Sequence, residues 1–407
     1  MMMSTMIVIK CCEIQWVNKE ILKTMKIVYV DNAATSQPLC QEQTSLWANA
    51  SSAHSLGIAA RRAIEEARLR VAQNLRVHPT HVFFTASGTE ATNLVVKNTP
   101  WCAIITSTIE HDATRKSVSS VDKPVILLPV DSKGTLNVSI TNLEQQLKLI
   151  HNAKQVLITI IHTNNEIGTI QDLSYIEKIK THVKSILPAC EIVLHLDCVQ
   201  SIGHDAPLRM PPFVDMISLS AHKFHGPRGV GILICTTPEY LRHQPLLHGG
   251  GQEAGVRPGT ENLPGIRAAA EMLQRINDDK YWLSSSVKLQ NLCDTVIHYL
   301  APFILSGAII LTGNSNKKSI NMLTFCIRGA KYKNILRRLD DCGICASSGS
   351  ACSSASIIPS HVMTAIDVPP EYLWGHIRLS FSTQNTTREA HYIGQSLVTI
   401  IRSMCSV

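Results

Sequence analysis

Short apolar runs alternate with amphipathic segments through the first half of this 407-residue chain. Each run has the length of a buried strand, and the segments between the runs carry apolar residues at helical spacing. Strands that are separated by helices usually pair in parallel, with the helices packed on the sheet. The pattern therefore predicts an α/β protein with a mostly parallel sheet. The expected strands are Ala103–Thr106, Val125–Pro129, Val156–Ile161, Ile192–Leu196 and Met216–Leu219.

Polar residues follow four of these five runs. His111 comes shortly after the first run, Asn165 after the third, Asp197 and Gln200 after the fourth, and Ser-Ala-His-Lys (220–223) after the fifth. The carboxyl ends of parallel strands meet at one edge of an open α/β sheet, and ligands bind at that edge. Any one of these residues alone could be a hydrogen-bonded core residue. Their joint position predicts a ligand site.

The segment Met216–Ile234 places a lysine between two apolar strands. Lys223 lies in the turn that separates Met216–Leu219 from a second expected strand, Val230–Ile234. A lysine held there beside His222 would be partly desolvated, which lowers the pKa of the amine and makes it a nucleophile. The alternative is a solvated lysine at the tip of a hairpin.

A strand that runs into small residues and then a helix is a candidate phosphate site. His81–Thr85 reads as the strand, and ASGTEATN (86–93), with Gly88 and Thr89, opens the helical stretch. Free N–H groups and the helix dipole both favour an anion at such a position. The alternative is an ordinary Ser or Thr cap without a ligand.

A longer helix is expected at Ile58–Leu75. Its apolar stripe at helical spacing consists of Ile64, Ala67, Val71 and Leu75. Ser and Asn side chains of the preceding loop can cap it.

Composition excludes several classes of protein. The net charge is +7, but Lys and Arg form no block, so a dedicated nucleic-acid surface is not expected. Thirteen cysteines, an odd number without repeated spacing, favour free thiols in a reducing compartment. Cys342 and Cys345 form a lone CxxC, and without further ligands nearby we expect no metal site.

Residues 1–24 are expected to be an N-terminal extension without a part in the fold, and disordered. Charged residues interrupt its apolar patches, which excludes a signal peptide and a transmembrane segment. Its glutamates, and the absence of arginine before Arg61, exclude a transit peptide. Met25 opens MKIVYVDNAAT (25–35), which resembles a natural start. A cytoplasmic protein without contact to a membrane is the resulting prediction.

Together these residues match the chemical needs of pyridoxal 5'-phosphate (PLP). A buried carboxylate such as Asp197 would keep the pyridine nitrogen protonated, and a histidine would stack on the ring. A lysine would form the covalent link to the cofactor. Ser220, His222 and the turn at Thr89 would bind the phosphate.

Nine motifs in order resemble the NifS/IscS cysteine desulfurases, class V of the pyridoxal-phosphate aminotransferases. The resemblance covers residues 27 to about 390. It implies a fold-type-I PLP-dependent transferase, with a seven-stranded-type sheet in a large domain and a smaller α+β domain. The motifs are DNAAT, SGTEATN, EHD, NNEIG, HLDCVQ, SAHKFHGPRGVG, GGGQEAGVRPGTEN, SSGSACSSAS and HIRLSF.

The resemblance also implies a role for each site residue. Lys223 would be the Schiff-base lysine and Cys352 the nucleophile that takes sulfur from L-cysteine as a persulfide. His111 would stack on the ring and assist proton transfer. Asp197 would pair with the ring nitrogen and Gln200 with the phenolic oxygen. The phosphate would be held by Gly88, Thr89, Ser220 and His222, and Thr260 would reach the phosphate of the partner subunit in a homodimer. The substrate carboxylate would be bound by Arg378 and Asn165, and Asn165 also counts among the cofactor-binding residues.

Cys352 lies in CASSGSACSSASIIPS (345–360), a run of Ser, Gly and Ala that offers little core. A cysteine on such a loop can be exposed and form a thiolate, whereas an inert packed thiol fits the composition poorly. The expected large, PLP-binding domain covers residues 45–263. The small domain combines residues 25–44 with 264–407 and carries the cysteine loop.

Three questions stay open at this point. The same motifs resemble selenocysteine lyases, so that activity is the alternative within the family. A catalytically inactive homologue with a binding or structural role is the alternative from another class. A sulfur-acceptor protein is expected as a partner, and no sequence feature identifies it. The compact form from Met25 also resembles NifS-like proteins of large cytoplasmic DNA viruses, which would place it in the host cytoplasm or virion.

Overall fold

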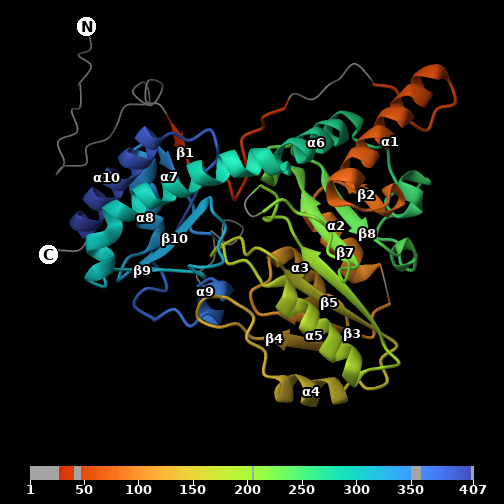
Figure 1. Ribbon diagram of the computed structural model, residues 1–407, viewed down its shortest axis with the longest axis horizontal. Coiled ribbons are helices and arrows are strands. Elements are labelled where there is room, and N and C mark those ends of the chain that lie inside the picture. The colour runs from red at the N-terminus through yellow and green to blue at the C-terminus, as the bar shows by residue number, and fades with distance from the viewer. Residues whose placement is uncertain (1–26, 41–46, 99, 204–205, 350–358, 405–407) are drawn as a thin grey trace, which may run out of the picture.

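A seven-stranded sheet forms the centre of the larger part of the molecule (Figure 1). The computed structural model describes residues 27–40, 47–98, 100–203, 206–349 and 359–404, so residues 1–24 and Cys352 lie outside the described residues. The strand order is β2-β8-β7-β6-β5-β3-β4. The strands are β2 (Val82–Thr85), β3 (Ala103–Ser107), β4 (Val125–Leu128), β5 (Gln155–Ile161), β6 (Glu191–Asp197), β7 (Met216–Ser220) and β8 (Gly231–Cys235).

The sheet is mostly parallel, as predicted. Strands β4, β3, β5, β6 and β7 pair in parallel, and β8 runs antiparallel between β7 and β2. Six of the seven strands are buried along almost their whole length because helices cover both faces, whereas the edge strand β4 exposes Val125 and Leu127. The five parallel strands end at one edge, and the polar residues that follow them meet there.

Two groups of helices cover the sheet, one on each face (Figure 1). The first group buries its apolar side chains in one core cluster with the sheet and consists of α1 (Ser55–Leu75), α4 (Ile140–Lys148), α5 (Leu173–Ile186) and α6 (Leu263–Ile276). The second group packs on the opposite face and consists of α2 (Gly88–Lys97) and α3 (Asp112–Ser119). Short 3-10 turns lie at Pro79–His81, Ala221–Lys223, Pro238–Arg242 and Gln252–Gly255.

A second hydrophobic cluster lies around a smaller three-stranded sheet and a two-stranded pair, and of these the pair joins the N-terminal part of the chain to the C-terminal part. In this sheet β10 pairs antiparallel with β12 and β9, while β1 and β11 form a separate parallel pair. Helix α7 reaches from the end of α6 to this cluster (Figure 1). The elements are β1 (Val28–Tyr29), α7 (Asp279–Leu305), β9 (Ile309–Leu311), β10 (Met322–Ile327), α8 (Tyr332–Asp341), β11 (Ile344–Cys345), α9 (His361–Ala365), β12 (His376–Ser380) and α10 (Thr387–Met404).

The first long helix begins earlier than its apolar stripe predicts. The sequence places it at Ile58–Leu75 with a Ser or Asn cap, whereas α1 begins at Ser55 and its N-cap is His54. The Nδ1 atom of His54 accepts a hydrogen bond of 3.3 Å from the backbone N–H of Gly57. The expected cap was therefore wrong, since an imidazole nitrogen satisfies the exposed N–H group here.

Within the described ranges, no helix combines the length and the apolar content that crossing a bilayer requires.

Candidate active site

A cavity of about 480 Å³ lies at the edge where the parallel strands end. This volume is in the range of pockets that hold small molecules and cofactors. Nine of the predicted site residues line it, contributed by α2, by the last residues of β6 and β7, and by the segments that follow β3, β5, β6 and β7. They are Gly88, Thr89, His111, Asn165, Asp197, Gln200, Ser220, His222 and Lys223.

Lys223 reaches from the turn after β7 to the turn that follows β1. Its Nζ donates hydrogen bonds to the carbonyl oxygens of Ala33 (2.6 Å) and Ala34 (2.9 Å). Both alanines also line the cavity. These carbonyls hold the amine at the cavity wall. The position of the Lys223 side chain therefore depends on a segment nearly 190 residues away in the sequence.

One end of the cavity is suited to an anion. Ser87 caps α2 by accepting a hydrogen bond of 3.1 Å from the backbone N–H of Glu90, and Gly88 and Thr89 form the first turn. Gly88 is closely packed, because a Cβ atom there would lie 2.7 Å from Val199 Cγ2. The helix N-terminus thus presents N–H groups and a positive dipole end to the cavity.

His222 also lines the cavity and is neutral at physiological pH. Burial, followed by the positive charges of Lys223 and Arg228, lowers the pKa of His222 to about 4. Its Nδ1 lies 3.2 Å from Thr35 Oγ1. A neutral imidazole and the hydroxyl of Ser220 are therefore hydrogen-bonding partners for a ligand in the cavity.

Asp197 is a buried carboxylate in the cavity wall, 3% exposed. Its Oδ1 accepts a hydrogen bond of 3.0 Å from the backbone N–H of Val199. Burial raises the pKa of this carboxyl, while His111, Val199 and Lys223 act in the opposite direction. A ligand with a protonated ring nitrogen would stabilise the ionised form.

His111 caps α3 and faces the same cavity. Its Nδ1 accepts a hydrogen bond of 3.1 Å from the backbone N–H of Ala113. Burial lowers the pKa of His111, so the imidazole is neutral and carries its proton on Nε2.

Gln200 belongs to the same network. Its Nε2 donates a hydrogen bond of 2.8 Å to the carbonyl of Ala33, which also accepts from Lys223. The amide and the amine therefore share one carbonyl at the cavity wall.

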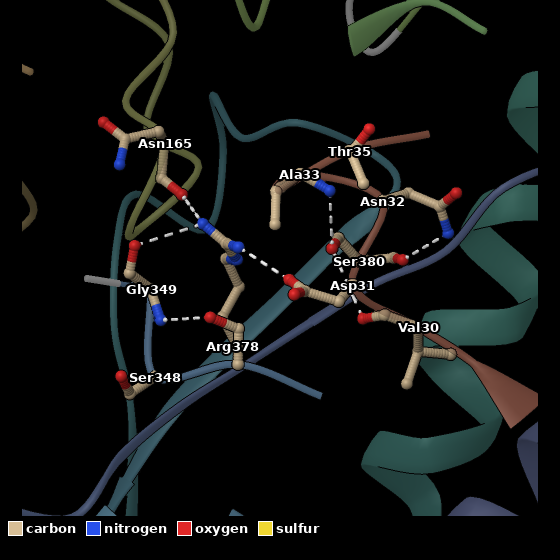
Figure 2. Close-up of polar contacts among 12 residues, drawn as sticks. Val30, Asp31, Asn32, Ala33, Thr35, Asn165, Ser348, Gly349, Arg378 and Ser380 are labelled. Carbon is tan, nitrogen blue, oxygen red and sulfur yellow. Dashed lines mark hydrogen bonds and ion pairs between the residues drawn. The ribbon is translucent and has the colours of Figure 1, made fainter. Parts of the chain in front are cut away.

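Arg378 does not line the cavity in the part of the chain that the structure describes. It lies behind Asn165 and Gly349, both of which do, and its side chain is 2% exposed (Figure 2). Its Nη1 donates to the carbonyls of Asn165 (2.6 Å) and Gly349 (3.3 Å), and its Nη2 donates to Asp31 Oδ1 (2.8 Å). The guanidinium that is expected to bind the substrate carboxylate is therefore already paired with Asp31.

One further predicted residue, Thr260, does not line the cavity. Thr260 is exposed and lies beside a separate depression with Glu253, Arg257 and Glu261. Cys352 is outside the described residues. Gly349 and Ser360, which flank residues 350–358, both line the cavity.

Sequence reasoning missed several residues of the cavity wall. Glu166 accepts a hydrogen bond of 2.6 Å from Ser360 Oγ, and burial raises the pKa of Glu166 to about 7. His361 lies beside them, and its Nε2 is 2.9 Å from the carbonyl oxygen of Glu110. Glu166 stands in the NNEIG motif, whose glutamate could have been noted, whereas no local pattern marks Ser360 or His361.

The wall of the cavity fits PLP. A buried carboxylate, a neutral histidine and a lysine amine face a cavity that ends at a helix N-terminus. The carboxylate suits a protonated pyridine nitrogen, and the histidine suits an aromatic ring. The lysine suits an aldehyde, and the helix N-terminus suits a phosphate. Among the described residues, no group of three potential metal ligands is present.

Comparisons with known proteins identify the family. The family model for class-V aminotransferases matches residues 28–393. The chain belongs to the NifS/IscS-type cysteine desulfurases of this family. It is a PLP-dependent enzyme.

The similarity extends over most of the chain. "Cysteine desulfurase IscS" of Dictyoglomus turgidum is 33% identical, covering 93% of this chain and 96% of the relative. The protein of the same description from Clostridium botulinum (strain Hall) is also 33% identical, covering 93% and 95%. A solved structure described as a NifS-like protein superposes with a TM-score of 0.78 at 30% identity, covering 93% of this chain and all of that one. The predicted fold class and enzyme class are confirmed.

Proposed function

We propose that the protein converts L-cysteine to L-alanine and leaves the sulfur on Cys352 as a persulfide. The observation that carries this proposal is the convergence of Lys223, Asp197 and the N-terminus of α2 on one cavity. The relatives named as cysteine desulfurases support the substrate. The persulfide on Cys352 rests on the resemblance, because residues 350–358 lie outside the described ranges.

The chain would hold PLP through the residues that line the cavity. When bound, PLP supplies an electron sink for the carbon that carries the substrate's amine. Asp197 would keep the ring nitrogen protonated, and Gln200 would meet the phenolic oxygen. The phosphate would be bound by Gly88, Thr89, Ser220 and His222. Thr260 of a second subunit would also bind it.

Proton transfer falls to Lys223 and His111. Lys223 would hold the cofactor covalently, and its free amine would act as a base at the cavity wall. His111 would assist, because a neutral imidazole can take up a proton and return it from the imidazolium form. Asn165 and Arg378 would orient the substrate carboxylate, which suits the fork of a guanidinium.

Sulfur transfer needs a thiolate. The sulfur leaves the β-carbon of L-cysteine and forms a bond to Cys352 Sγ, while a proton replaces it on the carbon to give L-alanine. Cys352 lies in a run of Ser, Gly and Ala, a composition that suits a reactive thiol better than a packed one.

Replacing the thiol tests this step. Cys352→Ser should keep the colour of bound PLP and still bind L-cysteine, but form no persulfide and release little alanine, since an alcohol is a much weaker nucleophile than a thiolate. Alanine release and persulfide labelling measure the outcome, and Cys102→Ser, remote from the cavity lining, is the matched control. Desulfuration by Cys352→Ser at the wild-type rate would exclude Cys352, and Cys345 and Cys342 would be tested next.

The same proposal includes a homodimer, a sulfur-acceptor protein and a cytoplasmic location. The exposed position of Thr260 supports a role toward a second subunit, because the residue lies apart from its own chain's cavity. Assay of L-selenocysteine beside L-cysteine distinguishes the desulfurase from a selenocysteine lyase.

We also propose a division into a large and a small domain, with the bounds expected from the sequence (45–263, and 25–44 with 264–407) changed at one point. Separate hydrophobic clusters around the two sheets support it. The apolar residues of α6 belong to the cluster of the large sheet, which favours a boundary after Ile276 rather than before it.

A further inference from the structure

Arg378 has two kinds of neighbour around its guanidinium (Figure 2). On Nη1 are the backbone carbonyls of Asn165 and Gly349, at 2.6 and 3.3 Å. The strand that carries Arg378 is also fixed, since its backbone N–H and carbonyl both bond to Ser347, at 2.7 and 3.2 Å. These contacts orient the side chain without any contribution from Asp31.

On the other side of the guanidinium, only one of the two nitrogens that could bind a carboxylate has a hydrogen-bond partner among the described residues. Asp31 uses one carboxylate oxygen, which accepts from Nη2 at 2.8 Å. Nε, which lies on the same side as one N–H of Nη2, is buried and has no hydrogen-bond partner among the described residues. A carboxylate bound by both nitrogens would form the two-point pair that arginine makes with carboxylates. Asp31 fills one of these two points.

The Asp31 carboxylate is not needed for the turn in which it stands. That turn is closed by backbone bonds, from the N–H groups of Ala34 (3.0 Å) and Thr35 (3.3 Å) to the carbonyl of Asp31. Tyr29 adds a hydroxyl bond to the same carbonyl, at 3.0 Å. The side chain is 21% exposed, so its carboxylate can move into water when it leaves Arg378.

We propose that Asp31 is a resident competitor for the substrate carboxylate. Between turnovers it neutralises the buried guanidinium of Arg378, because an unpaired buried charge is costly. The α-carboxylate of the amino acid then displaces it by binding both Nε and Nη2. The inference rests on the proposed role of Arg378 and assigns Asp31 a specificity role beyond it: Asp31 lowers the affinity for the amino acid and favours release of alanine.

Removing the charge tests the competition. Asp31→Asn keeps the size of the side chain and leaves the backbone turn intact, so we expect L-alanine to bind the PLP-loaded enzyme roughly fivefold more tightly, as a neutral amide competes less well than a carboxylate. L-Alaninamide, which lacks the carboxylate, should bind both proteins equally. Isothermal titration calorimetry measures the two dissociation constants.

Two further variants serve as a second test of the charge and as a control. Asp31→Ser, which also lacks the charge, should tighten L-alanine binding in the same direction and replaces Asp31→Asn if the latter does not fold. Asp172→Asn removes a carboxylate from an exposed ion pair with Lys317 and should change neither ligand's affinity. Equal or weaker binding of L-alanine in the Asp31 variants, or equal tightening of L-alaninamide, would overturn the inference. A wild type that releases no alanine from L-cysteine would instead overturn the proposed function.

Discussion

Glu110 is a fully buried carboxyl next to His111, and its environment favours the protonated form. Its Oε1 accepts hydrogen bonds from Ser107 Oγ (2.5 Å) and from the backbone N–H of Ile161 (2.9 Å), while Oε2 has no partner among the described residues. Burial outweighs these bonds and raises the pKa of Glu110 to about 8. The side chain therefore titrates close to physiological pH.

This pKa predicts a change of stability with pH. Between its usual value of 4.5 and about 8, the folded chain holds a proton on Glu110 that the unfolded chain releases. Raising the pH through this window therefore destabilises the fold, by on the order of a few kcal/mol. Glu110→Gln should lose less unfolding free energy than wild type between pH 5 and 8, as measured by urea unfolding.

Other titrating groups are common to both proteins, so the difference between the two curves reports on Glu110. Glu177→Gln, an exposed residue on α5, is the matched control and should follow the wild-type curve. Parallel curves for wild type and Glu110→Gln would show that Glu110 keeps an ordinary pKa.

At the scale of residues, the sequence predicted the side chains that directly follow an apolar run. Asp197, Asn165 and Lys223 are found by this local pattern, since the end of a parallel strand fixes their position. Other contacts join segments far apart in the chain, so no local sequence pattern predicts them. They are the bonds from Lys223 to the carbonyls of Ala33 and Ala34 and the pairing of Asp31 with Arg378.

Strand β8 and helix α2 lie in close contact at the anion end of the cavity. A Cβ atom on Gly231 would lie 2.3 Å from the backbone carbonyl carbon and oxygen of Ser87, the residue that caps α2. Backbone at that distance must move, and the N-terminus of α2 would move with it. Gly231 is therefore required at this close approach.

Gly231→Ala should weaken PLP binding and destabilise the fold by roughly 2 kcal/mol, because overpacking displaces the cap of α2. Equilibrium dialysis of PLP and thermal unfolding measure the two effects. Gly251→Ala is the control, since a Cβ atom there meets nothing within 4 Å. Unchanged PLP affinity in Gly231→Ala would mean that α2 does not hold the phosphate.

At the scale of elements, the apolar runs predicted the strands of the large sheet to within one or two residues. Their order across the sheet was not predicted, because it depends on which strands pair rather than on the composition of any strand. The start of α1 was misplaced for a local reason, the cap formed by His54.

For the whole molecule, the proposed homodimer predicts that sites are shared between subunits. Lys223→Ala and Thr260→Ala proteins should each have low activity at limiting PLP. Mixed dimers should regain activity, because one of their two sites combines an intact Lys223 with an intact Thr260. Alanine release after mixing measures this, with subunit exchange checked by tagged chains. No recovery in exchanged dimers would contradict the crossing of Thr260.

The joining of the N-terminal strand β1 to the C-terminal part of the chain follows from the family resemblance and not from any residue pattern. The parallel pair of β1 with β11 and the bond from Asn32 Nδ2 to the carbonyl of Ser380 (2.8 Å) hold residues more than 300 apart in sequence. Only a known relative supplies such information.

The most direct measurement is the yield of L-alanine from L-cysteine by purified protein with PLP and a thiol reductant. The proposed function predicts equal amounts of alanine and sulfide, a loss of roughly 1,000-fold or more in Lys223→Ala, and wild-type rates in Lys148→Ala, which alters an amine outside the cavity lining. Wild-type protein that binds PLP but releases no alanine, or Lys223→Ala with wild-type activity, would contradict it.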